Sequence, residues 1–363
     1  MVDLATVAGV VLKTSFVVGA AGLLSLALRQ QSAAFSHVLW TAALAQCVLM
    51  PLAVFLLPAH EIIALPSAPT LPLPGVRGSE WQGAVAALWL AGTSFVLLRQ
   101  LPATIGLARW RRHASPLISL RWSATLARIG FDGRRLRVLE SQDITSPCTW
   151  GVMRPVLLLP TSGEAWPEAS RRAALLHELA HIERRDALSI VVARLACALY
   201  WYNPLVWIAA GRIRSLQERA CDDAVLRAGA TPSDYAQFLL DVAAHTSGAT
   251  RWVRASIGMT HGSSLRARIV AILDPEATRA RPRRIRVVAA CASLFVFTAL
   301  LATVTVAVEP PSPPPAPTPE THKLPEPPVI PQTPVAAKLP VPPVPPVLPK
   351  TPALPTPPVG PTQ

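Results

Sequence analysis

Long apolar stretches alternate along the chain with one central block that is rich in charged residues. Four stretches hold enough apolar residues in succession to cross a bilayer as helices, which takes roughly 20 residues each. They cover about residues 4–28, 38–57, 81–98 and 285–308. The pattern therefore predicts a mainly α-helical membrane protein with three spans in residues 1–100 and a fourth after the charged block.

The distribution of charge sets the expected orientation of these spans. Charged residues make up only 15% of the chain, against about 25% in soluble domains. The net charge of +13 comes entirely from residues 99–286, because the rest of the chain carries acidic and basic residues in equal number. Arginine clusters adjoin the third and fourth spans, as is typical of cytoplasmic segments. We expect residues 101–284 to be cytoplasmic, with both the N-terminus and the chain after residue 308 outside.

Two apolar stretches allow a second interpretation. Residues 4–28 could form a cleaved signal peptide, but they lack a basic start and are too long for one, which favours a membrane anchor. Residues 188–211 look like a fifth span. We interpret them as a buried or membrane-embedded helix broken at Asn203-Pro204, because a single crossing would separate the metal ligands proposed below.

Residues 309–363 hold more than half of the 39 prolines in the chain. Repeated proline removes backbone donors and favours extended polyproline II, so we expect a disordered tail without a packed core. Such a tail acts as a spacer or as the ligand of a partner in the cell envelope.

Cysteine content excludes two classes of protein. The five cysteines are widely spaced and none forms a CxxC pair. This pattern fits neither a disulfide scaffold nor a cysteine-rich zinc finger. We expect most of these cysteines to be small buried apolar residues.

The strongest chemical signal is the sequence His177-Glu178-Leu179-Ala180-His181. No glycine or proline interrupts residues 168–202, so the motif is expected on a helix, where histidines four residues apart point the same way. This is the spacing of two zinc ligands, with Glu178 placed to take a proton from zinc-bound water. The alternative is a surface helix with two solvated histidines, which the apolar residues in and around the motif disfavour.

A catalytic zinc ion also needs a third protein ligand and an open position. Glu218 and Asp222 lie four residues apart on a second predicted helix. We expect Glu218 to bind the metal and Asp222 to orient a ligand histidine through its other ring nitrogen. The alternative is an ordinary charged helix face on which Arg214 pairs with Glu218.

A short apolar run, 156–159, lies between two prolines. Flanking prolines predict a strand at the edge of a sheet. Such an edge binds an extended substrate by strand addition, so the candidate substrate-binding residues are Val156, Leu157 and Leu158. A small structural strand is an equal alternative.

Peptide hydrolysis also needs a hydrogen-bond donor for the developing oxyanion. Tyr235, His245 and several arginines are candidates, and the sequence does not choose among them. Tyr235 is the first candidate among them.

Several segments in order resemble the BlaR/MecR-type membrane zinc metallopeptidases. These are HELAHIERRD at 177–186, WYNPLVW at 201–207, QERACDDAVL at 217–226 and the segment 146–160. The resemblance covers about residues 1–310. It implies a gluzincin-like α+β peptidase domain in a multi-pass protein of the bacterial inner membrane. It also implies one Zn²⁺ per chain held by His177, His181 and Glu218, with Glu178 as catalytic base and Asp222 in support.

The resemblance further implies an endopeptidase that transduces an envelope signal by cleaving a cytoplasmic protein, such as a winged-helix repressor of the BlaI/MecI type. Family members that sense β-lactams carry a penicillin-binding domain after the last span. No SxxK motif follows residue 308 here, so we do not expect covalent sensing.

The sequence raises two other functions. A non-enzymatic envelope scaffold would act through the proline-rich tail, as in TonB-like energy transducers. Direct nucleic-acid binding is not expected, because the arginine clusters adjoin membrane ends and no helix-turn-helix signature is present. The expected partners are a protein substrate, membrane lipid and an envelope partner of the tail.

Overall fold

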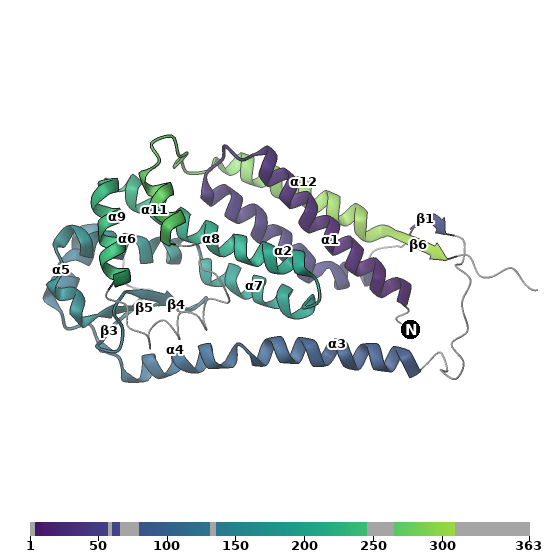
Figure 1. Ribbon diagram of the computed structural model, residues 1–363, viewed down its shortest axis with the longest axis horizontal. Coiled ribbons are helices and arrows are strands. Elements are labelled where there is room, and N and C mark those ends of the chain that lie inside the picture. Colours follow the sequence, from purple (N-terminus) through teal and green to yellow (C-terminus); the bar gives the residue numbers. More distant parts are fainter. Residues whose placement is uncertain (1–3, 57–59, 66–79, 131–135, 245–264, 309–363) are drawn as a thin grey trace, which may run out of the picture. The chain divides into compact units, whose positions relative to one another are not determined.

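A computed structural model describes residues 4–56, 60–65, 80–130, 136–244 and 265–308 (Figure 1). These residues are mainly helical, with one four-stranded sheet and one further pair of strands. Four of the described helices are long and apolar enough to cross a membrane. The predicted fold class, a mainly α protein with four candidate spans and a small sheet, is confirmed. The proline-rich tail, 309–363, lies outside the described residues.

Three candidate spans lie in α1 (Leu4–Ala27), α2 (Ala33–Leu56) and α12 (Arg284–Thr303), and the fourth is the stretch Gln82–His113, which begins in α3 (Glu80–Leu98). Helices α1, α2 and α12 pack against one another through buried apolar side chains such as Val17, Leu44 and Leu294. Large apolar side chains also point outward, among them Leu23 and Phe295. An apolar outer surface of this kind suits contact with lipid chains.

The predicted fourth span, 285–308, is helical only as far as Thr303. Its last five residues form strand β6 (Val304–Val308), which pairs in parallel with β1 (His60–Leu65). The sequence of β6 is VTVAV, and β-branched residues favour a strand over a helix. Hydropathy alone does not distinguish this apolar strand from the end of an apolar helix.

Residues 188–211 form two helices in a hairpin rather than one crossing. Helix α7 (Asp186–Leu199) ends before a turn, and α8 (Pro204–Arg227) begins at the proline. The Asn203 side chain caps α8 by accepting a hydrogen bond from the Leu205 amide at 3.0 Å. The predicted break at Asn203-Pro204 is therefore confirmed.

The turn of this hairpin is bonded to three candidate spans. Asn203 Nδ2 donates to Ser15 Oγ of α1 at 3.1 Å, and the Tyr200 hydroxyl donates to the Cys47 carbonyl of α2 at 2.9 Å. The Trp89 indole of α3 donates to the Leu199 carbonyl at 2.9 Å. Helices α7 and α8 also share one apolar core with α1, α2 and α12. The hairpin therefore packs directly against the span helices.

The four-stranded sheet has the order β2-β3-β5-β4. Its strands are β2 (Ser115–Pro116), β3 (Arg137–Ser141), β4 (Cys148–Trp150) and β5 (Val156–Pro160). Strand β5 lies inside the sheet, parallel to β3 and antiparallel to β4.

The prediction of an edge strand at residues 156–159 was therefore wrong. Every residue of β5 is buried, and Val156, Leu157 and Leu158 each pair with residues of both neighbouring strands. The prolines do not prevent this, because Pro155 precedes the strand and Pro160 is its last residue, which leaves the intervening amides free to bond. Among the described strands next to β5, β4 forms the outer edge.

The helix with the histidine motif, α6 (Glu168–Glu183), rests on this sheet. Leu175 of α6 is fully buried with Leu157 and Leu159 of β5 and with Trp122 of α5 (Leu120–Ile129). This packing fixes α6 on one side, while α8 packs against it on another.

The remaining described elements complete the surroundings of α6 and α8. Helix α4 (Leu101–His113) follows α3 and contacts β3, and the short 3-10 helix η2 (Thr161–Ala165) leads from β5 to α6. Helices α9 (Pro232–Ala244) and α11 (Leu265–Leu273) pack with α6 and α8 in a smaller apolar cluster that contains Ala173, Val225, Tyr235 and Ile272.

Candidate metal centre

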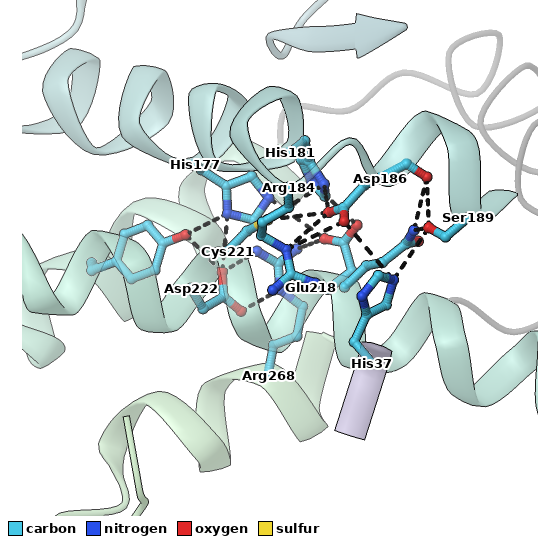
Figure 2. Close-up of polar contacts among 12 residues, drawn as sticks. His37, His177, His181, Arg184, Asp186, Ser189, Glu218, Cys221, Asp222 and Arg268 are labelled. Carbon is cyan, nitrogen blue, oxygen red and sulfur yellow. Dashed lines mark hydrogen bonds and ion pairs between the residues drawn. The ribbon is translucent and has the colours of Figure 1, made fainter. Parts of the chain in front are cut away.

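Two helices bring three metal-binding side chains together. His177 and His181 lie one turn apart on α6, and Glu218 faces them from α8 (Figure 2). The His177 Nε2 atom is 3.7 Å from Glu218 Oε2, and the His181 Nε2 atom is 3.8 Å from Glu218 Oε1. One ligand atom from each of the three residues lies within 4.8 Å of the others. The predicted metal ligands thus converge.

Asp222 holds the Nδ1 side of the His177 ring, as expected for a residue one turn beyond Glu218 on α8. The Asp222 Oδ1 atom lies 3.2 Å from His177 Nδ1. The Tyr235 hydroxyl donates to the same carboxylate oxygen at 2.7 Å and lies 3.1 Å from His177 Nδ1. Tyr235 was the weak candidate for the oxyanion donor, but its proton is engaged by Asp222 behind the histidine.

Asp186, which the sequence analysis did not single out, holds the back of His181. Its Oδ2 atom lies 2.8 Å from His181 Nδ1, and Arg184 Nε donates to Oδ1 at 3.2 Å. Asp186 is reached through Arg185, whose left-handed backbone (φ 56°) makes the sharp turn from α6 to α7. Helical spacing within α6 contains no signal for this contact, because Asp186 begins the next helix.

Both histidines are therefore oriented in the same way. Each presents Nε2 toward Glu218 and Nδ1 toward a buried aspartate, Asp222 for His177 and Asp186 for His181. A carboxylate behind a histidine fixes the ring and its tautomer, and this is the usual support of a metal-binding imidazole.

Arg268 is a second residue that the sequence analysis did not assign to the site. From α11 it donates through Nε and Nη2 to both oxygens of Asp222, at 2.8 and 2.6 Å. Its Nη1 atom lies 2.9 Å from Glu218 Oε2. Nothing in the local sequence links Arg268 to the motif, because 46 positions separate it from Asp222 and only the tertiary fold joins them.

Hydrogen bonds and ion pairs outweigh burial in setting the charges of the site. Burial opposes the charge of His177, yet the hydrogen bonds of Asp222 and Glu218 raise its pKa to about 9. Burial opposes the charge of Glu218 as well, but the Arg268 guanidinium and the neighbouring histidines hold its pKa well below the usual range. The pKa of Asp222 falls to about 2, because hydrogen bonds from His177 and Arg268 outweigh burial. Both carboxylates are therefore ionised at neutral pH.

A second trio of possible ligands consists of His181, Asp186 and Cys221. Burial, reinforced by the charge of Asp186, raises the pKa of the Cys221 thiol well above its ordinary value, and a neutral thiol is a weak ligand. Asp186 is also already bonded to His181 and Arg184. The trio of His177, His181 and Glu218 is the better metal site.

The donor set of that trio suits zinc. Two imidazole nitrogens and one carboxylate oxygen make up a common catalytic zinc set, which leaves a further position for water or substrate. The Glu218 side chain is 29% exposed and that of His181 is 18% exposed, so the trio is reachable from solvent.

Glu178 lies on α6 directly after His177 and is partly buried. Among the described residues, none donates a hydrogen bond to its carboxylate or forms an ion pair with it. Its charge contributes to the raised pKa of Cys221, one turn beyond Glu218 on α8. Glu178 thus adjoins the ligand His177 in the sequence without a bonded partner among the described residues. His245, another oxyanion candidate, lies outside the described residues.

Comparisons with known proteins find one matching family and several curated relatives. The family model described as BlaR1 peptidase M56 matches residues 5–272. A segment of 146 residues is 31% identical to the Regulatory protein BlaR1 of Bacillus licheniformis and covers 39% of this chain and 24% of that protein. A segment of the same length is 21% identical to the Methicillin resistance mecR1 protein of Staphylococcus aureus and of Staphylococcus epidermidis, covering 25% of each. The chain thus spans about a quarter of the length of these curated relatives.

Proposed function

The chain belongs to the BlaR1 peptidase M56 family, and on that premise we propose that it is a zinc-dependent endopeptidase of the membrane. The observation that carries the proposal is the convergence of His177, His181 and Glu218, with an aspartate behind each histidine. The alternative for the histidine motif was a solvated helix face. That alternative does not account for two histidines and a glutamate in this arrangement.

Each residue of the site has a separate role in peptide hydrolysis. His177, His181 and Glu218 hold the metal, which when bound polarises the scissile carbonyl and acidifies a water molecule. Glu178 accepts the proton of the attacking water and returns it to the leaving amine. Asp222 and Asp186 keep the two Nε2 atoms aimed at the metal, and Arg268 keeps Glu218 ionised.

We place the substrate on β4 rather than on β5. Strand β4 (Cys148–Trp150) pairs with β5 along one side and packs beside α6, the helix of the histidine motif. A peptide added to its other side would be held in an extended form, as hydrolysis requires. The stretch between Pro147 and Gly151 thus takes the role first assigned to residues 156–158.

The substrate we propose is a cytoplasmic regulatory protein, such as a repressor of the winged-helix type. The names of the relatives, a regulatory protein and a methicillin resistance protein, support a role in signalling. The excess of arginine in residues 99–286 supports a cytoplasmic peptidase domain in the inner membrane. The stimulus then acts from outside and reaches the metal site through the spans.

Two substitutions separate metal binding from catalysis. Glu178→Gln keeps the shape of the side chain but removes the base, so the purified full-length protein should retain zinc and lose cleavage. His181→Ala removes a ligand, so it should lose both. Zinc content by mass spectrometry and cleavage of a mixed protein substrate measure the two properties. Full cleavage by Glu178→Gln protein would contradict the proposal.

A further inference from the structure

A histidine of one membrane span lies close to Asp186, the residue that orients the proposed metal ligand His181. His37 lies near the start of α2, within the candidate span Ala33–Val54, and is only 4% exposed. An ionisable side chain inside a span is costly and usually has a function that depends on a specific partner. The His37 Nε2 atom lies 3.2 Å from Ser189 Oγ and 3.9 Å from Asp186 Oδ1, both on α7 (Figure 2).

The surrounding hydrogen bonds show which atom of this contact carries the proton. The Ser189 hydroxyl donates its single proton to the Asp186 backbone carbonyl at 2.8 Å. The Gln217 amide donates to Ser189 Oγ at 2.6 Å and to the same carbonyl at 3.1 Å. This arrangement leaves Ser189 Oγ as an acceptor for His37, which then carries its hydrogen on Nε2.

The same network continues into both ligand-bearing helices. Asp186 Oδ2 is bonded to Nδ1 of the ligand His181 at 2.8 Å, while Oδ1 faces His37 and Arg184. Gln217, which binds Ser189, directly precedes the ligand Glu218 on α8. His37 thus connects span α2 to Asp186, which is bonded to the ligand His181, and to Gln217, which precedes the ligand Glu218.

We propose that His37 is a positioning residue for the metal ligand His181, so that the placement of span α2 sets the geometry of the metal site. A shift of α2 against α7 breaks the bond between His37 and Ser189, whose hydroxyl binds the Asp186 backbone carbonyl, and so disturbs the first turn of α7 that carries Asp186. This gives a signal in the membrane a direct route to the metal. The proposal rests on the proposed function, because it requires that His181 bind the metal.

Zinc affinity of the full-length protein in lipid nanodiscs tests the proposal without any substrate. Affinity is measured by competition with a chromogenic zinc chelator. His37→Leu removes the donor and should weaken zinc binding roughly 10-fold, the lower end of the effect of losing a group that orients a ligand. His37→Gln places an amide donor near the position of Nε2 and should restore most of the affinity.

Gln46→Leu is the matched control. Gln46 is also a buried polar residue of α2, and it bonds Thr298 of α12 rather than the Asp186 network. Its substitution perturbs span packing to a similar degree, so zinc affinity should match that of the wild type. Ser189→Ala, which removes the acceptor of His37, gives an independent reading and should weaken binding as His37→Leu does.

The outcomes separate this proposal from the proposed function. Equal zinc affinities for His37→Leu, Ser189→Ala and Gln46→Leu would overturn the role of His37 and leave the metal site intact. A wild-type protein that binds no zinc would instead overturn the proposed function.

Discussion

Asp222 is the central residue of the hydrogen-bond cluster behind His177. One carboxylate meets His177, the Tyr235 hydroxyl and two nitrogens of Arg268, and all of them are buried or nearly so. The hydrogen bonds of this cluster depend on one another. Removal of the Asp222 carboxylate would leave the Arg268 guanidinium in its buried position with fewer partners. Tyr235, by contrast, contributes one neutral donor.

Substitutions in this cluster should therefore differ in their cost. Tyr235→Phe removes one hydrogen bond while Arg268 still pairs with Asp222, so the free energy of unfolding should fall by about 1 kcal/mol. Asp222→Ala leaves Arg268 with Glu218 alone and should cost about 3 kcal/mol or more. Chemical unfolding of the metal-free protein in detergent measures both values. A larger loss for Tyr235→Phe than for Asp222→Ala would contradict this account of the cluster.

The sequence predicts the site residues that occur as pairs four positions apart on one helix, and it misses Asp186 and Arg268. His177 and His181 follow from four-residue spacing, and Asp222 follows Glu218 by the same rule. Asp186 and Arg268 join the site through a turn and through a distant helix, so no periodicity reveals them. Prediction of such contacts requires knowledge of the tertiary fold.

At the scale of elements, strand order decides where a substrate can bind. The apolar content of residues 156–160 indicates a strand, but the same content also marks the most buried strand of the sheet. Burial on both faces gives a continuous apolar run, as β5 shows, whereas β4 is shorter and only partly buried. The hairpin of α7 and α8 was easier to predict, because Asn203-Pro204 marks its break in the sequence itself.

Proline substitutions along β4 test strand addition. Successive N–H groups of an antiparallel strand alternate between its neighbour and its free edge. Of Cys148→Pro and Thr149→Pro, one removes a bond to β5 and lowers stability. The other removes a donor from the edge that faces away from β5 and should slow cleavage roughly tenfold at unchanged thermal stability, the effect of about one hydrogen bond. Unchanged cleavage in both variants would exclude β4 as the substrate strand.

At the scale of the whole molecule, the metal site and the spans share one structure. The described residues up to Val308 belong to one compact unit, and a single apolar core joins α1, α2 and α12 to α7 and α8. The ligand helix α8 contacts α2 directly. Hydropathy divides the chain into spans and a charged block, but it cannot show that residues 186–213 of that block are packed among the spans.

The central claim is that this membrane protein cleaves other proteins by means of Glu178. The most direct test compares new protein N-termini, identified by mass spectrometry, in cells that express the wild type or Glu178→Gln at equal levels under envelope stress. We expect a small set of cuts that appears only with the wild type and includes a DNA-binding regulator. The same set of N-termini in both cell lines would contradict the claim.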